Sequence, residues 1–204
     1  QSHSIDRAGT GYIGDYSGQL TLVKNDVSSA STINPVSINH VYNSAYSAGE
    51  YYTVIDGAAN TYKSFEVGRG WMLDCMQIIV PSSNGYLMYV DGDGTVHYFY
   101  PSGSVYKDED GLGLSITKSG SNYTLTDKKD NIAYFTNGML SYTQDANGNR
   151  ITYVREDDVP VRVTRQNNGG SAETIATFTY NGLAQLYKIT DSAGNTTTFS
   201  YTNG

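Results

Sequence analysis

The chain has 204 residues, with 13 Lys and Arg against 20 Asp and Glu, and its net charge is −7. This length suffices for one large domain or two small ones, and the negative charge argues against nucleic acid or an anionic membrane as a partner, because both require a cationic surface. The longest apolar runs, such as 75–80, are far too short to span a bilayer, so membrane insertion is not expected.

The composition is typical of a β protein with many turns. It includes 22 Gly and 19 Tyr, and charged residues make up 16% of the chain, against ~25% in an average globular domain. Tyr and Thr favour pleated strands, whereas Gly and Asn favour turns. Cys75 has no disulfide partner in the chain and is interpreted as a small buried side chain.

Short strand-like runs follow one another along the chain, with Gly, Asn, Asp and Ser in almost every gap. No stretch combines helical periodicity with a cap at each end. The predicted strands are 19–23, 36–42, 76–80, 86–90, 96–100, 123–126, 132–135, 151–154, 174–180 and 196–201. We therefore predict an all-β fold built from antiparallel sheet.

The chain divides into two regions near residue 80. Residues 1–80 contain long Ser, Ala, Asn and Gly loops at 25–34 and 43–52, which predict an irregular N-terminal β region. Trp71 is interpreted as a core residue that closes one end of the sheet. Residues 81–204 predict a sheet of repeated β-hairpins, and strand pairing across the boundary would make the two regions one continuous domain.

One spacing recurs in the second region: an Asp is followed by Gly at the third position and by an aromatic residue at the eighth. Asp130 replaces Gly in one copy, Asn follows the third position in three copies, and Leu precedes the last two Asp residues by five positions. The repeat positions are Asp91, Gly94, Phe99, Asp127, Asn131, Phe135, Leu140, Asp145, Gly148, Asn149, Tyr153, Leu186, Asp191, Gly194, Asn195 and Phe199.

These polar clusters are interpreted first as hairpin turns. An Asp side chain can accept backbone N–H groups two residues further on, and Asn-Gly suits the two positive φ angles of a type I′ turn. If Asn147 and Gly148 are the centres of such a turn, Tyr142 lies opposite Tyr153. Further Asn-Gly turns are expected at 137–138 and 181–182.

The repeated stretches resemble the YD-repeat (RHS-repeat) family. The matching stretches are LSYTQDANGNRITYV at 140–154 and LYKITDSAGNTTTFSY at 186–201. Segments 8–27, 35–44, 68–80, 89–100 and 107–117 are similar to the non-repetitive part that precedes the repeats in such proteins. The chain departs from the family where Asn181 and Thr202 replace the Asp of the Tyr-Asp dipeptide, and Ser192 replaces the Pro of the self-cleavage segment.

The resemblance implies a curved antiparallel sheet of hairpins near the N-terminal end of a much larger bacterial protein, secreted or displayed on the cell surface. Large members of the family enclose a toxin or other cargo in such a sheet, which a piece with so few repeats cannot do. The expected partner is the remainder of the polypeptide, and no cofactor is expected.

The sequence contains only weak signals of catalytic or metal-binding sites. Ser115 and Lys118 spell S-x-x-K, but the K-S-G element that would accompany it shares the same lysine. The acidic run 108–110 would serve a glycosidase only if two carboxylates faced each other across a cleft. Asp91 and Asp93 are weak calcium candidates, because the segment lacks the further ligands of an EF-hand loop.

The many tyrosines leave a binding surface as the main alternative. Tyrosines paired across strands would favour a structural segment without chemistry, whereas tyrosines gathered on an exposed face would favour an adhesion module for glycans or a neighbouring protein. We expect the structural role, with adhesion as the alternative and an enzyme as the third choice. The terminal strand at 196–201 is expected to be covered or to pair with another molecule.

Overall fold

In a computed structural model, residues 2–4, 9–13, 18–46, 67–68, 70–82 and 84–202 are described. They form antiparallel sheets and contain no α-helix, which confirms the predicted all-β class. One turn of 3-10 helix, η2, spans Ser44–Tyr46. No helix in these ranges is both long enough and apolar enough to cross a membrane. Most of the loop predicted at 43–52 and parts of segment 8–27 lie outside the described residues.

The first sheet has five strands within the described residues, which follow one another in chain order. These are β1 (Ser2–Ser4), β2 (Thr10–Ile13), β3 (Leu20–Ser29), β4 (Val36–Asn43) and β5 (Trp71–Leu73). The pairing of β3 with β4 shifts between Asn25 and Val27, so Asp26 lies in a β-bulge.

The second sheet has thirteen strands in the described part of the chain, and eight of them close into a barrel. The barrel strands are β6 (Ile78–Pro81), β7 (Leu87–Val90), β8 (Val96–Ser102), β9 (Val105–Asp108), β10 (Ser115–Ser119), β11 (Asn122–Thr126), β12 (Ile132–Thr136) and β13 (Met139–Gln144). The barrel closes where Ile79 N–H donates to Gly138 O at 2.8 Å and Leu140 N–H donates to Gln77 O at 3.1 Å.

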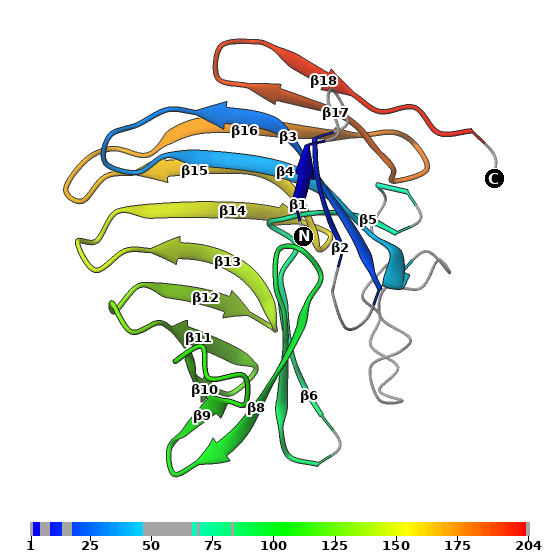
Figure 1. The fold of residues 1–204 in the computed structure, drawn as a ribbon. Helices are drawn as coiled ribbons and strands as arrows, with labels where there is room; N and C mark the ends of the chain where they lie inside the picture. Colours follow the sequence, from blue (N-terminus) through cyan, green and yellow to red (C-terminus); the bar gives the residue numbers. More distant parts are fainter. Residues whose placement is uncertain are drawn as a thin grey trace.

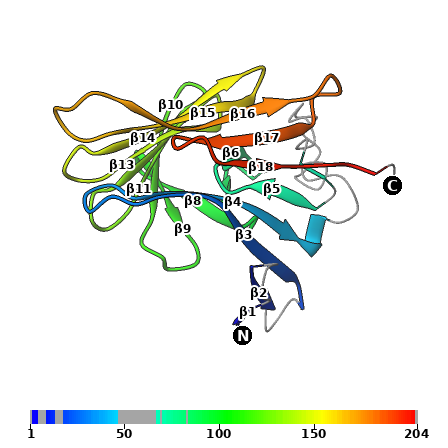
Figure 2. The ribbon, with the colours of Figure 1, turned by 90° about the horizontal axis from the view of Figure 1, so that it is seen from above.

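The sheet branches at β13. The first residue of β13 pairs with β6, whereas Tyr142, Thr143 and Gln144 pair with β14. From there the sheet continues as an open arm, with β14 (Arg150–Glu156), β15 (Val159–Gln166), β16 (Glu173–Tyr180), β17 (Leu186–Asp191) and β18 (Thr196–Thr198). Strands β3 and β4 lie across this arm in Figure 1 and form a separate layer below it in Figure 2.

Two hydrophobic cores hold these parts together. The first lies between the five-stranded sheet and the arm, and its members include Ile38, Val41, Met72, Val163, Phe178 and Ile189. The second fills the barrel, where the fully buried side chains include Phe99, Ile116, Phe135 and Leu140. Burying one such side chain stabilises the fold by about 1.5–3 kcal/mol. The boundary drawn after residue 80 falls inside β6, and the first core contains residues from both sides of it.

Side-chain burial confirms the prediction for Cys75, and it shows that Trp71 packs against the first core without being fully buried. Cys75 is buried, as predicted. Trp71 is only partly buried, because it lies on β5 at the edge of its sheet, where its ring packs against His40 at 4.9 Å and Tyr42 at 5.4 Å.

The register at 145–149 differs from the prediction. Tyr142 pairs with Thr152 and not with Tyr153, because the turn has five residues and Gly148 is the one among them with positive φ. On the other edge of β13, Tyr142 stacks on Tyr134 at 5.1 Å.

The two expected Asn-Gly turns have different outcomes. At 137–138 both φ angles are positive, at 50° and 81°, as a type I′ turn requires. The type I′ prediction at 181–182 is wrong, since the positive φ occurs at Ala184.

Candidate functional site

Each recurring Asp closes a five-residue turn. Asp145 N–H donates to Asn149 O, and Gly148 N–H donates back to Asp145 O, both at 3.0 Å. The Asp145 carboxylate accepts the N–H groups of Asn147 and Asn149 at 2.9 Å each and the Asn149 side-chain amide at 2.8 Å. The same contacts recur at Asp127 and Asp191. The Asn side chain contributes most to lowering the pKa of these carboxyl groups.

Neighbouring turns are also joined side by side. Asn131 Oδ1 accepts Ala146 N–H at 3.2 Å, and Asn149 Oδ1 accepts Asn168 N–H at 3.0 Å. Asn168 Nδ2 in turn donates to Asn147 O at 2.7 Å. The polar side chains of the turn at 145–149 are therefore bound within the sheet, as the hairpin-turn interpretation requires.

A fifth turn of this kind lies at 181–185, where sequence reasoning missed it. Asn181 takes the place of Asp, and its Oδ1 accepts the N–H groups of Leu183 and Gln185 at 2.9 and 3.0 Å. Its Nδ2 donates to Gln185 Oε1 at 3.0 Å, and Ala184 occupies the Gly position with φ 60°. The signal was the spacing itself: Asn181 is followed by the positive-φ residue Ala184 at the third position and by the buried Ile189 at the eighth.

The apolar repeat positions serve the cores. Phe99, Phe135, Leu140 and Leu186 are fully buried, and Tyr153 and Phe199 pack against the cores while partly exposed. The repeat spacing therefore places a core side chain on a strand next to each turn.

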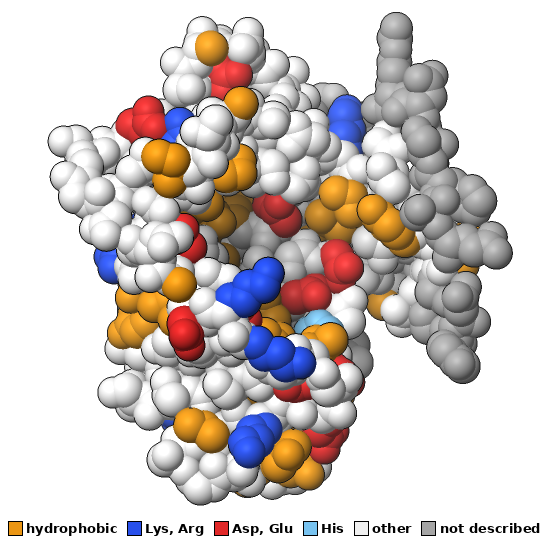
Figure 3. Space-filling view, turned by 60° about the vertical axis from the view of Figure 1, so that its left-hand side comes forward, with side chains coloured by type: hydrophobic (Ala, Val, Ile, Leu, Met, Phe, Trp, Pro, Cys, Tyr) orange, Lys and Arg blue, Asp and Glu red, His pale blue; other side chains and the backbone are white. Residues whose placement is uncertain are grey.

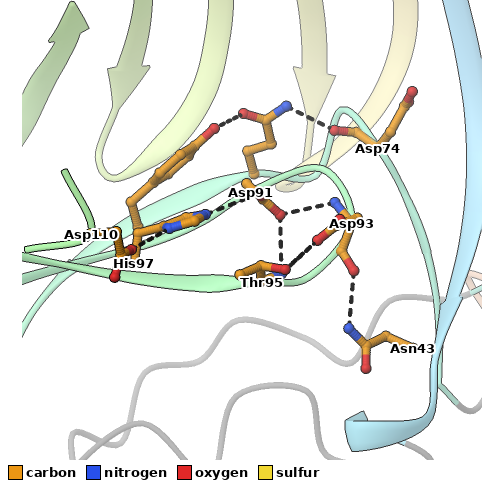
Figure 4. A network of polar contacts seen from close by, with 9 residues as sticks. Asn43, Asp74, Asp91, Asp93, Thr95, His97 and Asp110 are labelled. Atoms are coloured by element: carbon orange, nitrogen blue, oxygen red, sulfur yellow. Dashed lines mark hydrogen bonds and ion pairs between the residues drawn. The ribbon is translucent and has the colours of Figure 1, made fainter. Parts of the chain in front are cut away.

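The turn of Asp91 differs, because a histidine replaces Asn as the partner of the second carboxylate oxygen (Figure 4). Asp91 Oδ1 accepts the N–H groups of Asp93 and Thr95 at 3.0 Å each. Asp91 Oδ2 lies 3.1 Å from His97 Nε2, and Asp110 Oδ2 lies 2.7 Å from His97 Nδ1. His97 thus connects the 91–95 turn to the 109–114 loop.

The two carboxylates keep His97 charged. The hydrogen bond with Asp91 has the largest effect, burial opposes it, and Asp110 adds to it, so the pKa of His97 is raised to about 9. Both ring nitrogens are engaged, so neither is left to transfer a proton to a substrate. His97 therefore cross-links the 91–95 turn and the 109–114 loop through both ring nitrogens.

The same network joins the barrel to the first sheet (Figure 4). Asn43 Nδ2 donates to Asp93 O at 3.0 Å, and Asn39 Nδ2 donates to Asp74 Oδ2 at 2.6 Å. Burial raises the pKa of Asp74 to about 6. The Asn43–Asp93 contact ties β4 to the barrel, and the Asn39–Asp74 contact ties β4 to the segment that connects β5 with β6.

The structure gives the weak calcium candidates a role within the turn. Asp91 binds the N–H groups described above, and Asp93 Oδ1 accepts Thr95 N–H and Oγ1–H at 2.9 and 2.6 Å. In the described part of the chain, no three His, Cys, Asp or Glu side chains are arranged to hold a metal ion.

The acidic run 108–110 is likewise engaged. Asp108 accepts the N–H groups of Leu112, Gly113 and Leu114 at 2.6–3.0 Å, and Asp110 pairs with His97. Two of its carboxylates therefore stabilise a loop.

A pocket of about 440 Å³ lies beside the turns of Asp127 and Asp145. Leu114, Leu125 and Ile33 contribute apolar surface to it. The strand ends at the left of Figure 1 come forward in Figure 3, where this face is hollowed near its centre, with acidic, basic and hydrophobic side chains around the hollow. The two carboxylates at this pocket are already bound within their turns.

No protein-family model matches the chain. Curated proteins that match it include the tRNA3(Ser)-specific nuclease WapA of Bacillus spizizenii, the tRNA nuclease WapA of Bacillus subtilis strain 168 and the tRNA(Glu)-specific nuclease WapA of Bacillus subtilis subsp. natto. Each is 29% identical over 109 residues, which is 50% of this chain and 5% of the relative. The chain thus spans a small fraction of the length of these relatives.

The exposed tyrosines are the remaining candidates for a binding surface. Tyr12, Tyr98, Tyr100 and Tyr187 are the tyrosines with large exposed area among the described residues. Tyr98 and Tyr100 lie two residues apart on β8, at 44% and 37% exposure, and therefore point to the same side of the strand. Others, such as Tyr134 and Tyr142, stack across strands.

Proposed function

We propose that the chain is a non-catalytic structural segment of a larger bacterial polypeptide of the YD-repeat type, secreted or displayed on the cell surface. One observation carries the proposal: the recurring Asp and Asn side chains bind their own turn and the next one. Groups used in this way hold strands in register and are not available to a substrate. The match covers only 5% of the length of each relative, which supports a place for this segment within a long polypeptide.

In this proposal, the arm from β13 to β18 is a short run of a curved hairpin sheet, and the remainder of the polypeptide is its main partner. The names of the relatives describe tRNA nucleases, whereas two features of this segment oppose such an activity. Its net charge of −7 opposes the binding of a polyanion, and His97 has no nitrogen free for acid–base chemistry.

Incubation of the folded chain with tRNA, together with urea unfolding of turn variants, tests this function. We expect intact tRNA, and a lower urea midpoint for Asp145→Ala, because three hydrogen bonds to its carboxylate are lost. Glu156→Ala is the matched control, since it removes one exposed carboxylate outside the turns. Cleavage of tRNA by the wild type that a single substitution abolishes would overturn the proposal.

The second candidate is an adhesion module, which the exposed pair Tyr98 and Tyr100 favours. A glycan array with and without Ca²⁺ separates the two functions. Glycan binding that is lost in the Tyr98→Ala/Tyr100→Ala double variant supports adhesion at β8. Binding that persists in this folded variant excludes these tyrosines as the site.

A further inference from the structure

The fifth turn has the hydrogen-bond donors of the Asp turns but contains an amide. Asn181 Oδ1 accepts the N–H groups of Leu183 and Gln185 at 2.9 and 3.0 Å. The side chain four residues on is reversed, because Gln185 Oε1 accepts Asn181 Nδ2 at 3.0 Å. In the turn of Asp145, by contrast, Asn149 Nδ2 donates to Asp145 Oδ2 at 2.8 Å. A carboxylate in place of the Asn181 amide would complete the turn once the Gln185 amide rotates, since that amide offers both a donor and an acceptor.

The surroundings of Asn181 favour conversion of its amide. The two N–H groups on Oδ1 draw electron density from the carbonyl carbon Cγ and stabilise negative charge that develops on the oxygen. The next residue, Gly182, is exposed and has no side chain to hinder its nitrogen. Its N–H makes no hydrogen bond within the described residues. A nucleophile in the adjacent residue also avoids the entropic cost of bringing two molecules together.

The Asn-Gly pair at 147–148 has these groups arranged differently. Gly148 N–H donates to Asp145 O at 3.0 Å, so its nitrogen is already engaged. In the described part of the chain, Asn147 Oδ1 accepts no hydrogen bond, so its carbonyl is not polarised in this way. The same dipeptide in a second turn is therefore an internal control for Asn181.

We propose that Asn181 is a self-modification site, at which reaction with Gly182 and water converts the asparagine to aspartate. Gly182 N loses its proton to solvent hydroxide and bonds to Asn181 Cγ, the Cγ–Nδ2 bond breaks, and the amide takes a proton from water and leaves as ammonia. Water then adds to Cγ of the resulting cyclic imide, the Cγ–N bond breaks, and the nitrogen regains a proton. The net reaction consumes water and releases ammonia.

The same N–H groups select the product. Attack of water at Cγ restores the normal backbone, whereas attack at the other imide carbonyl gives isoaspartate and lengthens the backbone. Leu183 and Gln185 polarise only the Cγ carbonyl, so aspartate is the expected product. The new carboxylate accepts charge-assisted hydrogen bonds, which are stronger than those to an amide oxygen. The site thus goes beyond the structural role, because it strengthens the β16–β17 turn after folding.

Peptide mapping by mass spectrometry, after incubation of the folded full chain at neutral pH, tests the proposal. We expect Asn181 to lose its amide at least tenfold faster than Asn147, and the two sites to react at similar rates in urea, where the turns are lost. Gly182→Ala should slow the reaction at Asn181 at least tenfold, because the added Cβ hinders the nitrogen. This Cβ meets no atom within 4 Å, and Gly182 does not have positive φ, so the turn is retained. Leu183→Ala is the matched control, since it keeps the N–H donor and should leave the rate unchanged.

Asn181→Asp reproduces the product and should raise the urea midpoint above that of freshly purified wild type. Circular dichroism confirms that each variant is folded. Similar rates at Asn181 and Asn147 in the folded chain, isoaspartate as the main product, or an unchanged rate in Gly182→Ala would overturn the proposal. A lower urea midpoint for Asn181→Asp would also overturn it. The tRNA-cleavage assay has a separate readout, so the structural function and this site can fail independently.

Discussion

Five turns with the same hydrogen bonds differ in the residue that adopts positive φ. That residue is Gly94, Asp130, Gly148, Ala184 or Gly194, with φ between 60° and 87°. A side chain with a Cβ in this region costs roughly 1–2 kcal/mol, and Gly loses roughly 0.5–1 kcal/mol of backbone entropy when it is ordered. We therefore expect Ala184→Gly to raise the free energy of unfolding by about 0.5–1 kcal/mol.

The reverse substitution separates backbone strain from crowding. A Cβ added at Gly194 meets no atom within 4 Å, so Gly194→Ala should cost only the strain of about 1 kcal/mol. A Cβ added at Gly148 lies 3.1 Å from Cγ and Nδ2 of Asn168, whose Nδ2 donates to Asn147 O. Gly148→Ala should therefore cost about 1 kcal/mol more than Gly194→Ala, because it also disturbs this hydrogen bond.

Urea unfolding followed by fluorescence measures these differences. With an m value of about 2–3 kcal/mol/M, a change of 1 kcal/mol moves the midpoint by roughly 0.3–0.5 M. A lower midpoint for Ala184→Gly would refute the strain argument. Equal midpoints for Gly148→Ala and Gly194→Ala would refute the joining of neighbouring turns through Asn168.

Three further predictions concern the barrel and its surroundings. Leu140→Ala should lower the free energy of unfolding by about 2–5 kcal/mol, because the Leu140 side chain is fully buried. Leu183→Ala, at a side chain with 77% exposure, should change this free energy by less than about 0.5 kcal/mol. Similar urea midpoints for the two variants would contradict the assignment of Leu140 to the core. His97 has a pKa of about 9 when folded and 6.5 in a model peptide, so its stabilising effect is present below pH 6.5 and is lost as pH rises through 9. Between pH 6.5 and pH 9 the urea midpoint of the wild type should therefore fall more than the midpoint of His97→Gln. Midpoints that fall equally with pH in the two proteins would contradict the stabilising role of charged His97. Burial raises the pKa of Cys75 to about 12, so its thiol should react with an aromatic disulfide reagent only after unfolding, and rapid labelling of the folded chain would disprove this.

Features set by neighbours in sequence were predictable, because turn chemistry is local. The all-β class, the Asp turns and the type I′ turn at 137–138 follow from residue types a few positions apart. The register at Tyr142 was wrong by one residue, since a single positive φ replaced the expected two. Strands β9 and β10 were missed because they are short and polar, and β13, β15 and β17 were not predicted as separate runs. Barrel closure depends on a hydrogen bond between Ile79 and Gly138, which lie far apart in the chain, so no local sequence pattern predicts it.

The same distinction separates polar residues that build the sheet from those that can bind a ligand. An ionised carboxylate has about four acceptor positions. Asp145 already accepts three hydrogen bonds from its own turn. Asp26 lies outside the repeated turns, yet one of its buried oxygens lies 2.6 Å from His40 Nδ1 and the other has no hydrogen-bond partner among the described residues. A buried polar atom without a partner is costly, so it persists where the fold or a function requires it. Unused hydrogen-bonding capacity, and not the density of polar residues along the chain, therefore distinguishes side chains that can bind a ligand from side chains that build the sheet.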